Sequence, residues 1–144
     1  MGTLADIVKP DFLTVAPEDT LGEVADRMTR KNVGAVIVKD FGRLIGILTE
    51  RDMLRAMAAR VHTSDARVRQ FMTEDPITVA PDMDLEEAAQ IMLDHGFRHL
   101  PVVDGPTVLG IVSLRRVLGG RRQPASEASE AAAASPPAPA PEAA

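Results

Sequence analysis

The residues of this sequence best suited to chemistry lie in segment 46–52, which reads GILTERD. An apolar run typical of a strand ends there, and Thr49 and Asp52 follow, three residues apart, at the start of a predicted helix. A helix start offers free backbone N–H groups and a positive dipole end, which suits a phosphate beside the Thr49 hydroxyl. Asp52 could accept hydrogen bonds from both hydroxyls of a ribose. The same spacing also fits a capping box that only starts the helix, so both interpretations stay open.

Composition excludes several other kinds of chemistry. The 144 residues include no cysteine, so thiolate nucleophiles, disulfides and cysteine-ligated metals are excluded. The three histidines, His62, His95 and His99, show no metal-ligand spacing. The sequence has no P-loop, no nucleophile elbow and no histidine placed to activate a nucleophile. We therefore expect a protein that is not an enzyme and holds no metal and no cofactor.

Charge and hydropathy bear on location and partners. The net charge is −5, and four Phe are the only aromatic residues besides histidine, so a basic face and stacking platforms for nucleic acid are missing. Asp6 interrupts the N-terminal stretch, which therefore does not resemble a secretory signal. No apolar stretch approaches the roughly 18 residues that span a bilayer. We expect a cytoplasmic protein without nucleic-acid or membrane partners.

An internal repeat organises the chain. A shift of 64 residues lays the sequence on itself without a gap, so that the TVAP of residues 14–17 falls on that of residues 78–81. The same register pairs Leu21 with Leu85, Met28 with Met92, Val38 with Val102, Gly46 with Gly110 and Arg51 with Arg115. Two copies of one structural unit are therefore predicted.

Each copy predicts the order strand, helix, strand, strand, helix. The first copy gives strands at 13–15, 35–38 and 44–48, a helix starting after Thr20 and a second helix at 50–60. The second copy gives strands at 77–79, 100–103 and 108–112, a helix starting after Asp84 and a second helix at 114–118. Neither half can cover both faces of its sheet alone. The expected fold is α/β, with the two tandem repeats packed about a pseudo-two-fold axis.

The boundaries follow from composition. The polar stretch 61–67 separates a first domain at 1–62 from a second at 68–120. Residues 121–144 are almost wholly Ala, Pro, Ser and Glu, with no large apolar side chain to bury. Such a segment cannot offset the entropy of ordering, so a disordered tail is predicted.

The repeated pattern resembles the CBS domain, and the two copies resemble a CBS pair, or Bateman module. The motifs that carry the resemblance are TVAP, VGAVIV and GILTERD in the first copy, and TVAP, FRHLPVVD and GIVSLRR in the second. Together they cover residues from about 3 to 120. Members of this family commonly form dimers and bind AMP, ADP, ATP or S-adenosylmethionine between the copies, and they typically sense rather than catalyse.

The resemblance implies one intact cleft. Thr49 matches a position that hydrogen-bonds ribose or phosphate, Asp52 matches the ribose carboxylate, and Ile47 matches the apolar wall beside the sugar. Gly34 and Ala35 match positions that line the adenine. Residues from across the pseudo-symmetry axis complete this expected pocket: Val68, Phe97 and Arg98. For Ile47, Val68 and Phe97, core packing is an alternative role.

The second cleft departs from the family pattern. Its motif keeps Ser113 but places Arg116 where the carboxylate belongs, and an arginine cannot accept hydrogen bonds from ribose. The remaining residues assigned to this possible altered site are Ile111, Val33 and His99. We expect one good nucleoside site per chain.

The expected function is therefore a regulatory sensor. Its partners would be an adenine nucleotide or S-adenosylmethionine as regulatory ligand, a second copy in a homodimer, and an unidentified effector protein. The alternative is a structural dimerisation module with no physiological nucleotide ligand.

Overall fold

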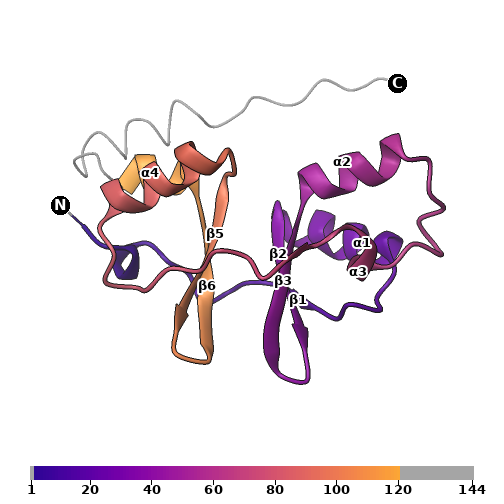
Figure 1. Ribbon diagram of the computed structural model, residues 1–144, viewed down its shortest axis with the longest axis horizontal. Helices are drawn as coiled ribbons and strands as arrows, with labels where there is room; N and C mark the ends of the chain where they lie inside the picture. Colours follow the sequence, from indigo (N-terminus) through magenta and orange to yellow (C-terminus); the bar gives the residue numbers. More distant parts are fainter. Residues whose placement is uncertain (1, 121–144) are drawn as a thin grey trace.

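The computed structural model describes residues 2–120 and contains two α/β repeats (Figure 1). The first repeat comprises β1 (Thr14–Val15), α1 (Leu21–Lys31), β2 (Ala35–Asp40), β3 (Arg43–Thr49) and α2 (Glu50–Ala58). The second comprises α4 (Leu85–His95), β5 (His99–Asp104), β6 (Thr107–Ser113) and α5 (Leu114–Gly120). Shorter elements precede each repeat: η1 (Leu4–Asp6), α3 (Val68–Phe71) and β4 (Thr73–Glu74). The expected α/β class with two tandem repeats is confirmed, and the predicted tail at 121–144 lies outside the described residues.

The sequence also has capping-box spacing, a cap residue with an acid three residues later, at Thr20 with Glu23 and at Asp84 with Glu87, and the structure follows these signals only in part. Thr20 caps α1 as expected, since its Oγ1 accepts a hydrogen bond from the Glu23 N–H at 3.2 Å. Glu23 does not complete the box, because its carboxylate accepts from the Thr20 hydroxyl instead of the backbone. Asp84 stands at the N-cap of α4 but makes no side-chain cap bond. The capping box predicted at Asp84 is therefore wrong in its bonding, although the helix begins where the sequence indicates.

The first hairpin has a tighter turn than predicted. β2 and β3 extend to Asp40 and Arg43, so only Phe41 and Gly42 connect them. Both have positive φ angles, 52° and 76°. Two left-handed residues in sequence form the turn whose twist matches that of the flanking strands. A glycine is favoured at such a position because it has no Cβ.

Both repeats use the same strand register. In the first, β1 pairs in parallel with β2, which pairs antiparallel with β3, and Val15 lies opposite Val38. In the second, Val79 bridges Val102 in parallel, and β5 pairs antiparallel with β6. The register shifts at the equivalent position, after Val38 and after Val102. The repeat seen in sequence is therefore a repeat of backbone pairing.

Each repeat is completed by the short segment that precedes the other repeat in the sequence. Leu4 of η1 is fully buried in the core of the second repeat, whereas Val68 of α3 is fully buried in the core of the first. The hydrogen bonds correspond as well: the Leu4 N–H donates to the Met83 carbonyl, and the Val68 N–H donates to the Asp19 carbonyl. Packing therefore joins residues 2–9 to the second repeat and residues 66–74 to the first.

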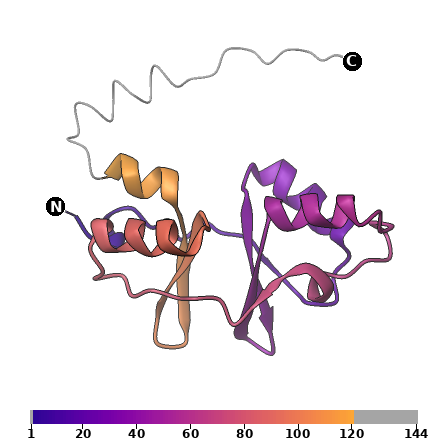
Figure 2. The same ribbon diagram turned by 45° about the horizontal axis from the view of Figure 1, so that its top comes forward.

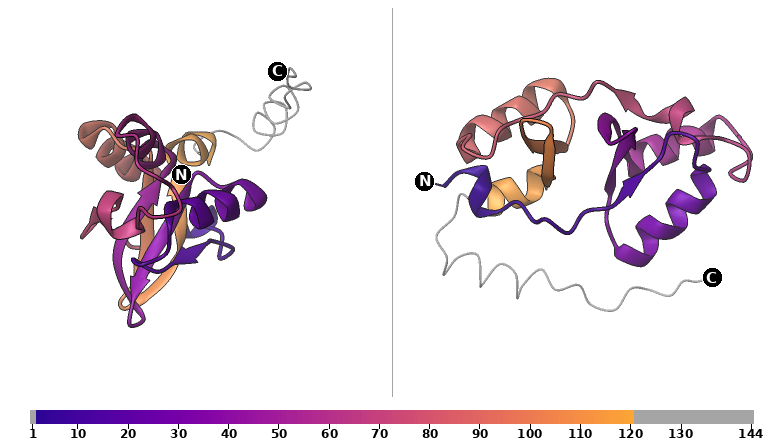
Figure 3. Two further views of the ribbon diagram at one scale, coloured as in Figure 1. Left: turned by 90° about the vertical axis from the view of Figure 1, so that its right-hand side faces the viewer. Right: turned by 90° about the horizontal axis from the view of Figure 1, so that it is seen from below.

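These exchanged segments tie the halves together. The right-hand view of Figure 3 shows the chain crossing from η1, beside the second repeat, to the first repeat, while the linker after β4 crosses back. The two hairpins lie side by side at the centre of the molecule, where β2 contacts β6 (Figures 1 and 2). Within residues 2–120, no helix is both long and apolar enough to cross a bilayer.

Candidate ligand-binding site

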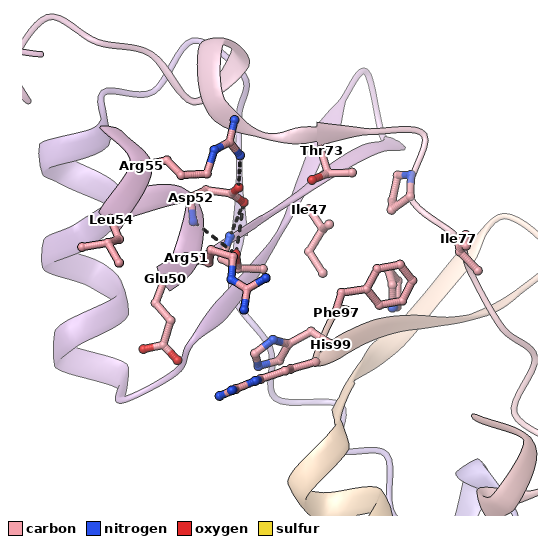
Figure 4. A pocket seen from close by; sticks show the side chains of 14 residues that line it. Ile47, Glu50, Arg51, Asp52, Leu54, Arg55, Thr73, Ile77, Phe97 and His99 are labelled. Atoms are coloured by element: carbon pink, nitrogen blue, oxygen red, sulfur yellow. Dashed lines mark hydrogen bonds and ion pairs between the residues drawn. The ribbon is translucent and has the colours of Figure 1, made fainter. Parts of the chain in front are cut away.

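A cavity of about 610 Å³ opens between the two repeats (Figure 4). Its lining comes from three parts of the chain: the end of β3 with the start of α2, the linker that follows β4, and the start of β5 with the residues just before it. Small-molecule sites commonly occupy roughly 300–1,000 Å³. The cavity is therefore large enough for a nucleotide, and neither repeat forms it alone.

Thr49 and Asp52 form a complete capping box at the start of α2. One Asp52 carboxylate oxygen, Oδ2, accepts from the Thr49 N–H at 2.9 Å and from the Thr49 hydroxyl at 3.2 Å. The Asp52 N–H donates in return to Thr49 Oγ1 at 3.4 Å. The capping interpretation of this motif is confirmed. Both residues also line the cavity, so the cap holds a hydroxyl and a carboxylate at its wall.

The second oxygen of Asp52 is paired with a cation. Oδ1 lies 2.8 Å from Arg55 Nη1, one turn along the same helix. Only 6% of the Asp52 side chain is exposed, against 61% for Arg55. A carboxylate this buried requires a partner, and the arginine supplies it while its outer donors remain in solvent.

Apolar side chains form the opposite wall. Ile47 of β3, Ile77 of the linker and Phe97, just before β5, gather on one side of the cavity, facing the charged start of α2 (Figure 4). The Phe97 ring stacks on the His95 ring, with centroids 5.3 Å apart and an interplanar angle of 20°. The His95 ring is held in turn by a 2.9 Å hydrogen bond between Nδ1 and the Ile91 carbonyl. This wall offers a flat, partly rigid apolar surface to an aromatic base.

Charged side chains from both repeats complete the lining. Glu50 and Arg51 come from α2, and Arg98 and His99 come from the second repeat. Burial lowers the pKa of His99 from its ordinary value of 6.5; Glu50 opposes this shift and Arg98 adds to it. The neutral form of the imidazole is therefore favoured in the folded protein. Among residues 2–120, no group of three or more acidic or histidine side chains is arranged to hold a metal ion.

A comparison with protein-family models identifies the family of this fold. The family model described as "CBS domain" matches the chain twice, at residues 4–59 and at residues 68–121. The chain belongs to the CBS-domain family. The two matches are the two repeats of the structure, so the expected CBS pair is confirmed.

Known CBS proteins agree in sequence and in fold. The chain is 36% identical over 114 residues to the CBS domain-containing protein YhcV of Bacillus subtilis, covering 79% of this chain and 81% of YhcV. The crystal structure of CBSX2 in complex with AMP aligns with a TM-score of 0.69 at 25% identity, over 84% of this chain and 96% of that one. The CBS domain pair of protein MJ0100, in complex with 5′-methylthioadenosine and S-adenosyl-L-methionine, aligns with a TM-score of 0.73 at 27% identity, over 83% and 98%.

The CBS pair brings five of the expected first-cleft residues together. These residues all line the cavity: Ile47, Thr49, Asp52, Phe97 and Arg98. Val68 does not, because it is fully buried in the core of the first repeat. The part that each lining residue plays in ligand binding stays a prediction.

Gly34 and Ala35 do not line this cavity either. Under the 64-residue shift they correspond to Arg98 and His99. The backbone confirms the correspondence, since the Glu50 N–H donates to the Gly34 carbonyl as the Leu114 N–H donates to the Arg98 carbonyl. Gly34 and Ala35 are thus the counterparts, in the first repeat, of two residues with which the second repeat lines the cavity.

Of the residues assigned to the altered cleft, only His99 lines the cavity described above. The Arg116 N–H donates to Ser113 Oγ at 3.1 Å, which repeats the helix start of Thr49 without its carboxylate. Ile111 and Val33 are half-buried on β6 and before β2. His99, by contrast, lines the cavity formed with α2.

Sequence reasoning left several lining residues out of the expected first site. They are Glu50, Arg51, Leu54, Arg55, Thr73, Pro76, Ile77, His99 and Pro101. Those on α2 could have been found from helical spacing around Asp52. The lining residues at 73–77 lie in or just after β4, a two-residue strand that pairs with Gly46 and Ile47. Because β4 carries no clear strand pattern in sequence, no signal could have found them.

Proposed function

We propose that this CBS pair is a regulatory protein that binds an adenosyl ligand, AMP, ADP, ATP or S-adenosylmethionine, in the cavity between its repeats. The observation that carries the proposal is the joint construction of that cavity. The first repeat supplies a buried carboxylate and a hydroxyl at a helix start, and the second supplies Phe97 and Arg98. The CBSX2 and MJ0100 structures, which are complexes with adenosyl ligands, support the same class of ligand.

The ligand would use both walls of the cavity. Its adenine packs against Ile47 and Phe97, where aromatic and aliphatic contact removes apolar surface from water. Its ribose hydroxyls donate to the Asp52 carboxylate, which the ion pair with Arg55 and the Thr49 cap hold in position. The 5′ substituent then points toward the charged side chains of α2 and the second repeat.

Signalling would follow from the shared site. A ligand held by both repeats favours the arrangement in which they are correctly spaced, and its differential affinity sets how far the population shifts. An effector protein would read that shift. The protein in this proposal is cytoplasmic and binds its ligand without converting it.

We include a homodimer in this proposal on account of three exposed apolar side chains. Leu54 and Met57 on α2 are 65% and 73% exposed, and Leu93 on α4 is 58% exposed. Figure 1 shows α2 and α4 on the same side of the molecule. A second copy covering these helices would remove that apolar surface from water.

Isothermal titration tests the proposal. AMP, ADP, ATP and S-adenosylmethionine are titrated into the wild type, into Asp52→Asn and into Phe97→Leu, with circular dichroism to show that each variant is folded. Saturable binding of at least one ligand, weakened about tenfold or more in both variants, is expected from the loss of a charged hydrogen bond or of an aromatic contact. Asp26→Asn, which changes an exposed carboxylate on α1, is the matched control and should bind as the wild type does.

The second candidate is a structural dimerisation module. It is favoured by the finding that every Asp52 oxygen already has a protein partner, so this carboxylate is satisfied without a ligand. No heat from any of the four ligands, together with a dimer by light scattering, would reject the sensor and leave this module.

A further inference from the structure

The cavity carries more positive than negative charge. Three arginines line it, Arg51, Arg55 and Arg98, against two carboxylates, Glu50 and Asp52. Arg55 is committed to Asp52 by the 2.8 Å ion pair. Two guanidinium groups and one carboxylate remain for a ligand to meet.

The two remaining arginines are weakly engaged. Arg51 Nη1 donates to the Gly96 carbonyl at 3.5 Å, which is the long limit of a hydrogen bond. Within residues 2–120, neither Arg51 nor Arg98 forms an ion pair. Because a guanidinium has five N–H donors in a planar fork, most of the donors on both side chains are available.

The remaining titratable group adds no charge near neutral pH. His99 lies on the same wall as Arg98, and burial keeps its pKa below the ordinary value despite the opposing effect of Glu50. The cavity thus keeps a surplus of one positive charge. Arg51 comes from the first repeat and Arg98 from the second, so an anion between them would be held by both.

Resting on the proposed function, we propose that the cavity selects phosphorylated adenosines, with Arg51 and Arg98 pairing the phosphate, and discriminates against the cationic sulfonium ligand. The geometry matches the two ends of a nucleotide: the apolar wall of Ile47, Ile77 and Phe97 receives the base, and the charged wall receives the phosphate (Figure 4). Guanidinium pairs phosphate oxygens in bidentate fashion. S-adenosylmethionine carries net positive charge and would meet like charge at the same place.

Adenosine, AMP and S-adenosylmethionine separate this selection from adenosyl binding itself. The three share the base and the ribose, so only the 5′ substituent differs. Titration at low ionic strength should give AMP an affinity at least about tenfold higher than adenosine, as one charge-assisted contact supplies. S-adenosylmethionine should bind no more tightly than adenosine. Added salt should weaken AMP and leave adenosine unchanged.

Arginine variants test whether these side chains cause the preference for AMP over adenosine. Arg51→Gln and Arg98→Gln should each lower the AMP affinity about tenfold while leaving adenosine binding unchanged. Arg43→Gln, an exposed arginine at the start of β3 and outside the cavity, is the matched control and should alter neither.

Two kinds of failure are distinguishable. Equal affinities for adenosine and AMP, tighter binding of S-adenosylmethionine, or variants that weaken adenosine as much as AMP would overturn the phosphate selection and leave adenosyl sensing in place. Absence of binding by all three ligands, and by ADP and ATP as well, would reject the proposed function together with this inference.

Discussion

Asp52 and Arg55 form an ion pair across the first turn of α2, with Asp52 Oδ1 2.8 Å from Arg55 Nη1. The carboxylate is nearly buried, and its other oxygen closes the capping box with Thr49. One side chain therefore starts a helix, holds an arginine in place and forms part of the cavity wall. Stability and ligand binding are coupled at this position.

Asp52→Ala should destabilise the protein measurably. The change removes the acceptor of the Thr49 N–H and hydroxyl and leaves Arg55 without its partner, which together cost about 1–3 kcal/mol of unfolding free energy. Urea unfolding followed by circular dichroism measures the loss.

Asp26→Ala is the matched control for that measurement. Asp26 pairs with Arg30 at 3.0 Å one turn apart on α1, but both side chains are exposed. Exposed helix pairs contribute about 0.5 kcal/mol or less. Equal losses in the two variants would show that the burial of Asp52 adds nothing to its role.

The regular elements of the fold could be predicted from sequence because their signals are local. The 64-residue repeat, the strand alternation and the cap at Thr20 depend on neighbouring residues. The structure shows the elements they indicate except the strand expected at 77–79, where only the bridge between Val79 and Val102 forms. The two-residue strand β4 and the short α3 could not, since so few residues carry no period. Packing on the first repeat sets the conformation of α3, as the full burial of Val68 shows, whereas β4 is set by its pairing with β3.

The candidate site, like the fold, could be predicted from sequence only where its residues lie close together along the chain. Thr49 and Asp52 sit on one helix start, so their spacing fixes their proximity. The assignment of Gly34, Ala35 and His99 to clefts depends instead on which repeat faces which, and that is decided by contacts between distant segments. The exchange of η1 and α3 between repeats is likewise absent from any local pattern.

The exchange makes a prediction about the N-terminal segment. Leu4→Ala should destabilise the second repeat, because Leu4 is fully buried among Leu85, Leu100 and neighbouring core residues. Truncation of a buried leucine costs about 2–5 kcal/mol. Thermal unfolding measures the loss, and Phe41→Ala, at a side chain 96% exposed, should change stability by no more than about 0.5 kcal/mol. A small effect at Leu4 would show that residues 2–9 do not contribute to that core.

Stability should fall in mild acid because of His99. Its folded pKa lies below 6.5, so as pH drops through 6.5 the unfolded chain takes up the proton before the folded chain does. Unfolding free energy is therefore retained above pH 6.5 and lost between that value and the lowered pKa.

Urea unfolding between pH 5 and 7.5 tests this dependence. His99→Gln should show a flatter profile of unfolding free energy against pH than the wild type. It removes the imidazole whose charged form is disfavoured by burial and by Arg98 and favoured by Glu50. His62→Gln, an exposed linker substitution, should keep the wild-type slope. Identical slopes in all three proteins would assign the dependence to groups other than His99.

The altered cleft gives the last prediction, which concerns stoichiometry. Arg116 occupies the position in the second repeat that Asp52 occupies in the first. The hydrogen bonds show this equivalence, since the Arg116 N–H donates to Ser113 Oγ at 3.1 Å as the Asp52 N–H donates to Thr49 Oγ1. The position lacks only the carboxylate. On the proposed function, the wild type should bind one adenosyl ligand per chain, and Arg116→Asp should raise the number toward two by restoring an acceptor for ribose hydroxyls.

Isothermal titration supplies this number directly, and the neighbouring residue supplies the control. Arg115→Asp makes the same change in net charge but places the carboxylate one residue away from the Ser113 cap, so it should leave the stoichiometry at one. Two ligands per wild-type chain would contradict the loss of the second site. An equal gain in Arg115→Asp and Arg116→Asp would mean that net charge, and not the position of the acceptor, had closed the cleft.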